Sequence, residues 1–191
     1  MDLTNRQPVV MDAAALARRI DRPIVLVGMM GVGKSSVGRR LAAALDCPFV
    51  DADDAIEESA KMSIQDIFDQ FGEASFRDGE RRVIARLIEE GGGCKVIATG
   101  GGAFCNDETR ALILDRAIAV WLDSDIDTLV ERTSRKNNRP LLRQGDPREI
   151  LARLRKEREP AYAQAPIHVQ SGKGPHGETV NNVLKSIEKW L

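Results

Sequence analysis

The chain has 191 residues, of which 42% are hydrophobic and 30% charged, and its formal net charge at pH 7 is −1. This length suits one domain with a full core, and the near-neutral charge provides no basic field of the kind that binds nucleic acid. The three cysteines form no C-x-x-C pair and the two histidines stand apart, which argues against a disulfide framework, a zinc ribbon or another metal cluster.

No apolar run reaches the length that spans a membrane, and the N-terminus shows no apolar signal core. Together with the unpaired cysteines, these features predict a cytoplasmic protein with no membrane or nucleic-acid partner. Residues 1–22 are expected to be an N-terminal extension, in which Asp12 caps a short helix.

From residue 23 onward, apolar strand-like segments alternate with helical ones. Predicted strands cover 23–28, 48–50, 95–98, 117–122 and 167–169. Predicted helices cover 34–45, 52–60, 63–72, 73–90, 106–115, 124–133, 148–158 and 178–191, with caps at Ser63, Asn106 and Ser124 and a stop at Pro160. This alternation predicts a parallel sheet covered by helices on both faces, with ligands at the carboxyl ends of the strands. Residues 134–147 are polar and broken by proline and glycine, which predicts a mobile loop.

The first predicted strand leads into a G-x-x-x-x-G-K-S motif over residues 28–35, and a helix follows. The glycines let backbone N–H groups turn around a polyphosphate, and the helix start adds the positive end of its dipole. Lys34 can reach the β- and γ-phosphates, and the Ser35 hydroxyl can bind Mg²⁺. The alternative is a chance glycine turn, but the strand, the spacing and both side chains favour a phosphate loop.

Two more loops should meet the phosphate loop above the sheet. Asp51 and Asp53 end the second strand, where one carboxylate could hold Mg²⁺ through water and the other could orient or deprotonate a substrate hydroxyl. The alternative is helix capping, which can coexist with catalysis. Gly100–Gly102 ends the third strand and would let backbone N–H groups approach a ligand, or would simply form a tight turn. The other glycine triplet, 91–93, is interpreted as a turn that ends a helix.

Three arginines are candidates for binding anions, namely Arg77, Arg139 and Arg158. A guanidinium can hold a carboxylate or phosphate through two hydrogen bonds, and a loop arginine can stabilise transferring charge. Taken singly, each is more typical of a solvated surface charge.

The ordered set of motifs resembles the shikimate kinase family over about residues 23–180. The matching segments are 28–35, 51–53, 76–77, 100–102, 139–142 and 158–162. The resemblance implies a nucleoside-monophosphate-kinase-like P-loop fold, a three-layer α/β/α domain whose five-stranded parallel sheet has the order 2-3-1-4-5. It also implies transfer of the ATP γ-phosphoryl to the 3-hydroxyl of shikimate, which yields ADP and shikimate 3-phosphate for chorismate and aromatic amino acid synthesis. The core would be 23–134 and 148–191, with a shikimate-binding part at about 51–80 and a lid at 135–147.

The resemblance also implies roles for individual residues. Lys34, Asp53 and Arg139 would be catalytic, and Arg139 would arrive on the lid. Shikimate would be bound by Asp53, Arg77, Gly100, Gly101, Gly102 and Arg158. ATP, the co-substrate, would be bound by Gly31, Val32, Gly33, Lys34, Ser35, Ser36, Arg132 and Arg139. One Mg²⁺ ion per subunit would be held by Ser35 and by Asp51 through water, and the enzyme would be a monomer.

Two features depart from the family pattern. The segment 171–175, Ser-Gly-Lys-Gly-Pro, stands where the family often has an adenine-contacting arginine, and the extension 1–22 is longer than a minimal member needs. Other functions remain possible at this point. A gluconate or nucleotide kinase would keep the phosphate loop, and a scaffold could bind ATP without catalysis. A regulatory GTPase would need an N-K-x-D motif that residues 137–140 do not supply.

Overall fold

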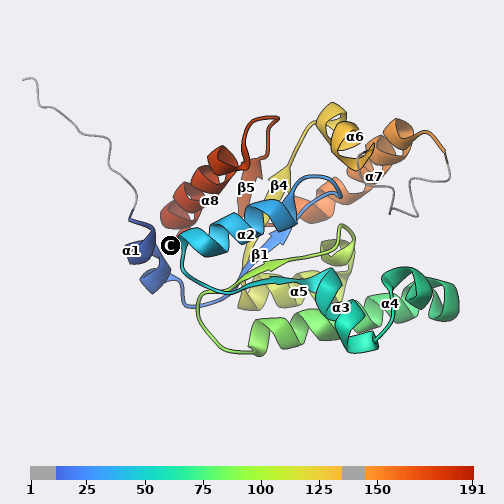
Figure 1. Ribbon diagram of the computed structural model, residues 1–191, viewed down its shortest axis with the longest axis horizontal. Coiled ribbons are helices and arrows are strands. Elements are labelled where there is room, and N and C mark those ends of the chain that lie inside the picture. The colour runs from blue at the N-terminus through green and yellow to red at the C-terminus, as the bar shows by residue number, and fades with distance from the viewer. Residues whose placement is uncertain (1–11, 135–144) are drawn as a thin grey trace, which may run out of the picture.

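The computed structural model describes residues 12–134 and 145–191, in which five strands form one parallel sheet in the order β2-β3-β1-β4-β5 (Figure 1). The strands are β1 Ile24–Val27, β2 Phe49–Asp51, β3 Val96–Ala98, β4 Ile118–Asp123 and β5 Ile167–Gln170. The α-helices are α1 Ala13–Arg19, α2 Lys34–Ala44, α3 Ala52–Ala60, α4 Ile64–Glu89, α5 Asp107–Arg116, α6 Ile126–Ser134, α7 Pro147–Tyr162 and α8 His176–Trp190, with a 3-10 helix η1 at Ala103–Cys105. The predicted fold class and sheet order are confirmed.

The two central strands explain why helices must cover both faces of the sheet. Every residue of β1 and of β4 is buried, so neither strand has a face that could meet water. Helices α2 and α8 pack against each other on one face, and α4 packs against α5 on the other (Figure 1). Strand β5, at the edge, alternates buried and exposed residues.

The helix ends were mostly, but not entirely, predictable. Ser63 and Asn106 cap α4 and α5 as expected, each accepting a backbone N–H three residues on. Ser124 does not cap α6. Its hydroxyl donates to the Ser171 carbonyl oxygen, and Asp125 accepts from the Thr128 N–H instead. The carboxylate one residue later therefore takes the capping role.

The predicted helix boundary near Gly72 is confirmed, and the predicted stop at Pro160 was wrong. Gly72 has φ 79° and ψ 173°, which are not helical, so α4 consists of two helical segments that meet at a kink there. Helix α7 continues past Pro160 to Tyr162, because proline removes one N–H while the Ala163 N–H still donates to the Glu159 carbonyl oxygen.

A second, smaller hydrophobic cluster lies under the kinked helix. It is centred on Ile56, Ile67 and Phe76, between α3 and α4, and stands apart from the main core. Phe71, beside the kink, is 59% exposed. The predicted shikimate-binding part thus rests on a much thinner core than the phosphate loop does.

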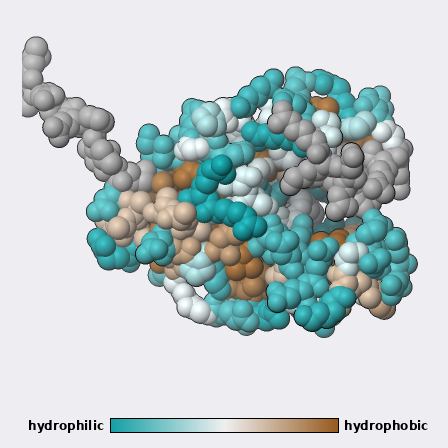
Figure 2. Space-filling model, viewed as in Figure 1, coloured by the Kyte–Doolittle hydropathy of each residue, from teal (hydrophilic) through white to brown (hydrophobic). Residues whose placement is uncertain are grey.

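The surface is mostly polar on the face shown in Figure 2, with hydrophobic colour gathered beside α1. Within 12–134 and 145–191, no helix is both long and apolar enough to cross a membrane.

Candidate active site

The phosphate loop leaves β1 and enters α2 through three glycines with positive φ. Gly28, Gly31 and Gly33 have φ values of 136°, 82° and 100°, which other residues rarely adopt. A side chain on Gly28 would also collide with the carbonyl oxygen of Leu122 in the neighbouring strand. Gly33 is the N-cap of α2, so the loop delivers the chain to the positive end of that helix.

Lys34 lies across this loop. Its ammonium group donates to the carbonyl oxygens of Gly28 at 2.8 Å and Met29 at 2.9 Å, and the residue is 8% exposed. The charge is thus held at the mouth of the loop, where phosphate oxygens can compete with the carbonyl oxygens for it.

Ser35 and Asp51 meet at the start of α2 and the end of β2. The Ser35 hydroxyl donates to one Asp51 carboxylate oxygen at 2.6 Å, and the other oxygen accepts the Asp53 N–H at 3.1 Å, which caps α3. Asp51 therefore caps a helix and also faces the phosphate loop, as the sequence allowed. A hydroxyl and a carboxylate beside a phosphate site fit Mg²⁺, which takes few protein oxygens and keeps several waters. In the described part of the chain, no group of three or more His, Cys, Asp or Glu side chains could hold a metal alone.

Asp53 carries an unusually basic carboxylate. Burial, together with the nearby charges of Asp51 and Glu80, raises its pKa to about 6, although Lys34 opposes the shift. A carboxylate of this kind accepts a hydrogen bond or a proton more readily than a solvated aspartate does.

Gly100 opens the glycine triplet and separates two carboxylates. A Cβ atom built on it would lie 2.9 Å from an Asp53 carboxylate oxygen and 3.1 Å from a Glu80 carboxylate oxygen. Its φ is not in the positive range, so glycine is needed here for space and not for an unusual backbone conformation.

Gly101 and Gly102 face the two arginines in the same way. A Cβ on Gly101 would lie 3.2 Å from Nη1 of Arg158, and one on Gly102 would lie 2.8 Å from Cζ of Arg77. Each glycine of the triplet therefore meets a different predicted substrate-binding side chain. Asp53, Arg77 and Arg158, which are far apart in the sequence, therefore lie next to one another along the Gly100–Gly102 backbone.

Glu80 is the residue of this site that the sequence interpretation missed. Its carboxylate accepts from Nη1 of Arg77 at 2.6 Å and is 2% exposed, and burial raises its pKa while Arg77 lowers it. Glu80 thus fixes one end of the Arg77 guanidinium, and Glu73 lies 3.6 Å from the other end. The i, i+3 spacing of Arg77 and Glu80 on a helix was the available signal.

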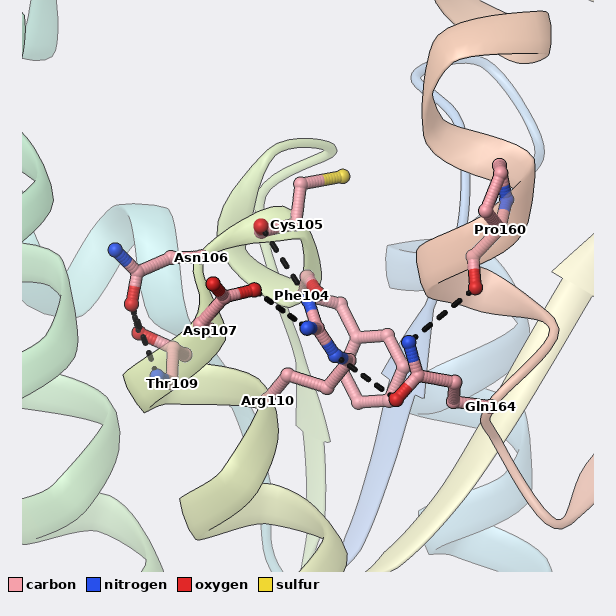
Figure 3. A network of polar contacts seen from close by, with 8 residues as sticks. All are labelled: Phe104, Cys105, Asn106, Asp107, Thr109, Arg110, Pro160 and Gln164. Atoms are coloured by element: carbon pink, nitrogen blue, oxygen red, sulfur yellow. Dashed lines mark hydrogen bonds and ion pairs between the residues drawn. The ribbon is translucent and has the colours of Figure 1, made fainter.

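Arg158 is positioned through α7 and its neighbours. Tyr162, one turn further along α7, is buried and donates to the Gly101 carbonyl oxygen, and burial raises its pKa. The side chain of Arg110 in α5 connects η1 to the end of α7, because it donates to the Phe104 carbonyl oxygen and to the Gln164 side chain (Figure 3). These bonds hold α7 against the segment that follows the glycine triplet.

Arg132 joins the phosphate loop to the loop after β5. Its guanidinium donates to the Val32 carbonyl oxygen at 3.0 Å and to the Gly172 carbonyl oxygen at 2.7 Å. His176, which no motif singled out, lies against Gly33, whose built Cβ would be 3.2 Å from the ring. Arg139 and lid residues 135–144 lie outside the described residues.

Relatives of known function share most of this chain. The shikimate kinase family model matches residues 30–188. A shikimate kinase of Novosphingobium aromaticivorans is 64% identical over 178 residues, which cover 92% of each chain. The chain belongs to the shikimate kinase family. A further shikimate kinase, from Caulobacter vibrioides, is 55% identical over 168 residues, covering 88% of this chain and 83% of its own.

Solved structures agree with this assignment. A shikimate kinase from Acinetobacter baumannii, solved in complex with shikimate, superposes with a TM-score of 0.86 at 34% identity, covering 93% of this chain and 97% of its own. A gluconokinase from Sinorhizobium meliloti reaches a TM-score of 0.62 at 19% identity and thus shares the fold alone. The enzyme catalyses the ATP-dependent phosphorylation of shikimate, and the resemblance predicted from the sequence is confirmed.

Proposed function

We propose that shikimate lies on the Gly100–Gly102 backbone with its carboxylate between Arg77 and Arg158. The supporting observation is that each glycine of the triplet faces a different site side chain. Two guanidinium groups suit a carboxylate because each can form charge-assisted, bidentate hydrogen bonds. The bare backbone between them leaves room for a flat, hydroxylated ring.

Asp53 stands at the other end of this surface and is assigned to the 3-hydroxyl. Its carboxylate lies beside Gly100, and its raised pKa of about 6 suits it to accept a hydrogen bond from that hydroxyl or to remove its proton. Because the transition state of phosphoryl transfer is loose, orienting the hydroxyl would contribute more than strong base catalysis.

The nucleotide is assigned to the opposite side of the site. Backbone N–H groups of residues 31–36 would surround the phosphates, Lys34 would leave its carbonyl partners for the β- and γ-oxygens, and Arg132 would lie beside the base. Arg139, by resemblance to the family, would close over the transferring phosphoryl group.

Ser35 and Asp51 would hold the Mg²⁺ ion, Ser35 directly and Asp51 through water. Their contact of 2.6 Å places both oxygens beside the phosphate loop. The ion, when bound, neutralises charge on the phosphate oxygens. We also assign a cytoplasmic location and a monomeric state, because the free cysteines suit a reducing compartment and one chain supplies the described site side chains.

Release of ADP, coupled to a spectroscopic readout, tests the acceptor. The purified enzyme is supplied with Mg-ATP alone, then with shikimate, gluconate or a nucleoside monophosphate, and phosphate position is read by NMR of the product. We expect stimulation by shikimate only, with phosphate on the 3-hydroxyl. Equal stimulation by another acceptor, or phosphate on another hydroxyl, would contradict the proposed placement.

A further inference from the structure

Two cysteines lie close together at the end of the sheet opposite the active site. The register pairs Phe49 of β2 with Val96 of β3, and Cys47 and Cys94 each stand two residues before those paired residues. The Val96 N–H donates to the Pro48 carbonyl oxygen at 2.9 Å, so the two chain segments are already in contact one or two residues from the cysteines. A disulfide spans about 4.4–6.8 Å between Cα atoms, a range that includes the spacing of about 4.8 Å between neighbouring strands.

The two thiols already interact. Their contact moves the two pKa values in opposite directions, upward at Cys47 and downward at Cys94, so the two thiols titrate as a pair. Both side chains are only partly buried, so a small reagent can reach them from solvent. Each cysteine follows a residue with positive φ, Asp46 at 50° and Gly93 at 74°, so the chain turns just before both cysteines.

We propose that Cys47 and Cys94 form a reversible dithiol–disulfide site that a low-molecular-weight disulfide can oxidise. One of the two cysteines, as its thiolate, attacks one sulfur of the reagent, whose S–S bond breaks and releases one thiolate. The other cysteine thiol then loses its proton and attacks the protein sulfur of the mixed disulfide, which expels the second thiolate. The protein loses two electrons and two protons, and the reagent leaves as two thiols.

The third cysteine has different surroundings. Cys105 lies in η1, where burial raises its pKa even though the nearby charges of Arg158 and Arg77 oppose the shift. A protonated thiol reacts slowly with disulfides, so Cys105 should be spared.

The bridge would close the segment 47–94, which contains β2, α3 and α4. Closing a loop of this size restricts the unfolded chain, so oxidation should raise the unfolding temperature by roughly 5 °C or more. The bridge joins strand starts, while the substrate groups lie at the strand ends, so we expect turnover to change by less than about twofold.

The experiment incubates the full-length enzyme with oxidised glutathione and follows thiol count, intact mass, peptide map and thermal unfolding. We expect the three free thiols to fall to one, the mass to drop by two hydrogens, a Cys47–Cys94 cross-linked peptide, and a higher unfolding temperature that dithiothreitol reverses. Persistence of three thiols, or modification of Cys105 first, would overturn the proposal.

Two single variants test the pairing of the sulfurs. In Cys47→Ser and in Cys94→Ser the remaining thiol has no neighbouring cysteine, so the reaction should stop at a stable mixed disulfide with glutathione and the unfolding temperature should not rise. A cross-linked peptide or a higher unfolding temperature in either variant would contradict the Cys47–Cys94 bridge.

Discussion

The two halves of the active site are built on different physical foundations. The phosphate loop lies on the main core, where Val32 and Val37 are fully buried, and it is proposed to bind through backbone groups that three glycines orient. The acid-binding half takes Arg158 from α7, but Asp53 and Arg77 come from α3 and α4, which pack on the small cluster of Ile56, Ile67 and Phe76; this half is proposed to bind through charged side chains.

The difference teaches how each half is made ready for its ligand. Backbone N–H groups are correctly placed for a ligand once the loop conformation is fixed, and packing against the main core fixes it. Guanidinium groups have many rotamers, so they need partners such as Glu80 for Arg77 and the Tyr162-anchored helix for Arg158. Changes in the first half should therefore lower turnover, and changes in the second should weaken shikimate binding selectively.

The largest effect is expected for Lys34→Ala. Removing a cation that stabilises the transferring charge should lower kcat by about 10³-fold or more while the fold is kept. Lys185→Ala, an exposed lysine on α8, is the matched control and should leave kcat unchanged. Steady-state ADP release measures both, and near-normal turnover of Lys34→Ala would contradict the assignment.

Removing either arginine of the acid-binding half should have the next largest effect. Arg77→Ala or Arg158→Ala loses hydrogen bonds between charged groups, worth about 1.5–3 kcal/mol, so shikimate affinity should fall about 10- to 100-fold. The matched controls are Arg82→Ala on α4 and Arg153→Ala on α7, whose side chains are 70% and 69% exposed. Calorimetric titration with shikimate measures the affinity of each variant and control. An unchanged affinity of Arg77→Ala or Arg158→Ala for shikimate would exclude that arginine from the site.

Adding one methyl group to the triplet should have a smaller, equally selective effect. Gly102→Ala places a Cβ 2.8 Å from Cζ of Arg77, so the guanidinium must shift and shikimate affinity should fall about tenfold. Gly79→Ala is the control because nothing lies within 4 Å of its Cβ, and it should stabilise α4 by about 0.5–1 kcal/mol without changing affinity. Similar affinities for the two variants would contradict a tight fit at Gly102.

Acidity should reduce catalysis through Asp53. Since its pKa is about 6 and its ionised form is the acceptor, kcat/KM should fall below pH 6 and approach about a tenfold loss per pH unit. The control is the exposed neighbour Asp54, whose charge is the smallest of the influences that raise the Asp53 pKa, so Asp54→Asn should keep the loss at low pH and move the profile only slightly toward lower pH. A profile that stays flat to pH 5 would exclude an essential Asp53 carboxylate.

The smallest effect concerns stability. The folded Asp53 carboxyl binds its proton more tightly than the unfolded chain does, so its contribution to the free energy of unfolding falls as pH rises from 3.8 to about 6. The free energy of unfolding of Asp53→Asn at pH 8 should therefore be about 1–2 kcal/mol higher than that of the unsubstituted enzyme, although the variant loses activity. Denaturant unfolding measures this, and a less stable variant at pH 8 would contradict the cost of burying that charge.

The fold was predictable because the strands are short apolar runs and the phosphate loop fixes where the first helix begins. The resemblance named Asp53, Arg77, Arg158 and Gly100–Gly102 as one group of site residues, and which side chain approaches which glycine required the three-dimensional structure. Glu80 was missed because a glutamate beside an arginine on a helix usually marks a solvated ion pair, and only burial shows otherwise. Helix α7 continues past Pro160 because the packing of the buried Tyr162 side chain outweighs the one backbone hydrogen bond that proline cannot donate.

The measurement that tests the two-half description most directly is calorimetric titration of Gly102→Ala with shikimate and, separately, with a non-hydrolysable ATP analogue. We predict a dissociation constant about tenfold weaker for shikimate and unchanged, to within about twofold, for the nucleotide. Equal weakening of both ligands, or of the nucleotide alone, would contradict the division of the site into a backbone-built nucleotide half and a side-chain-built acid half.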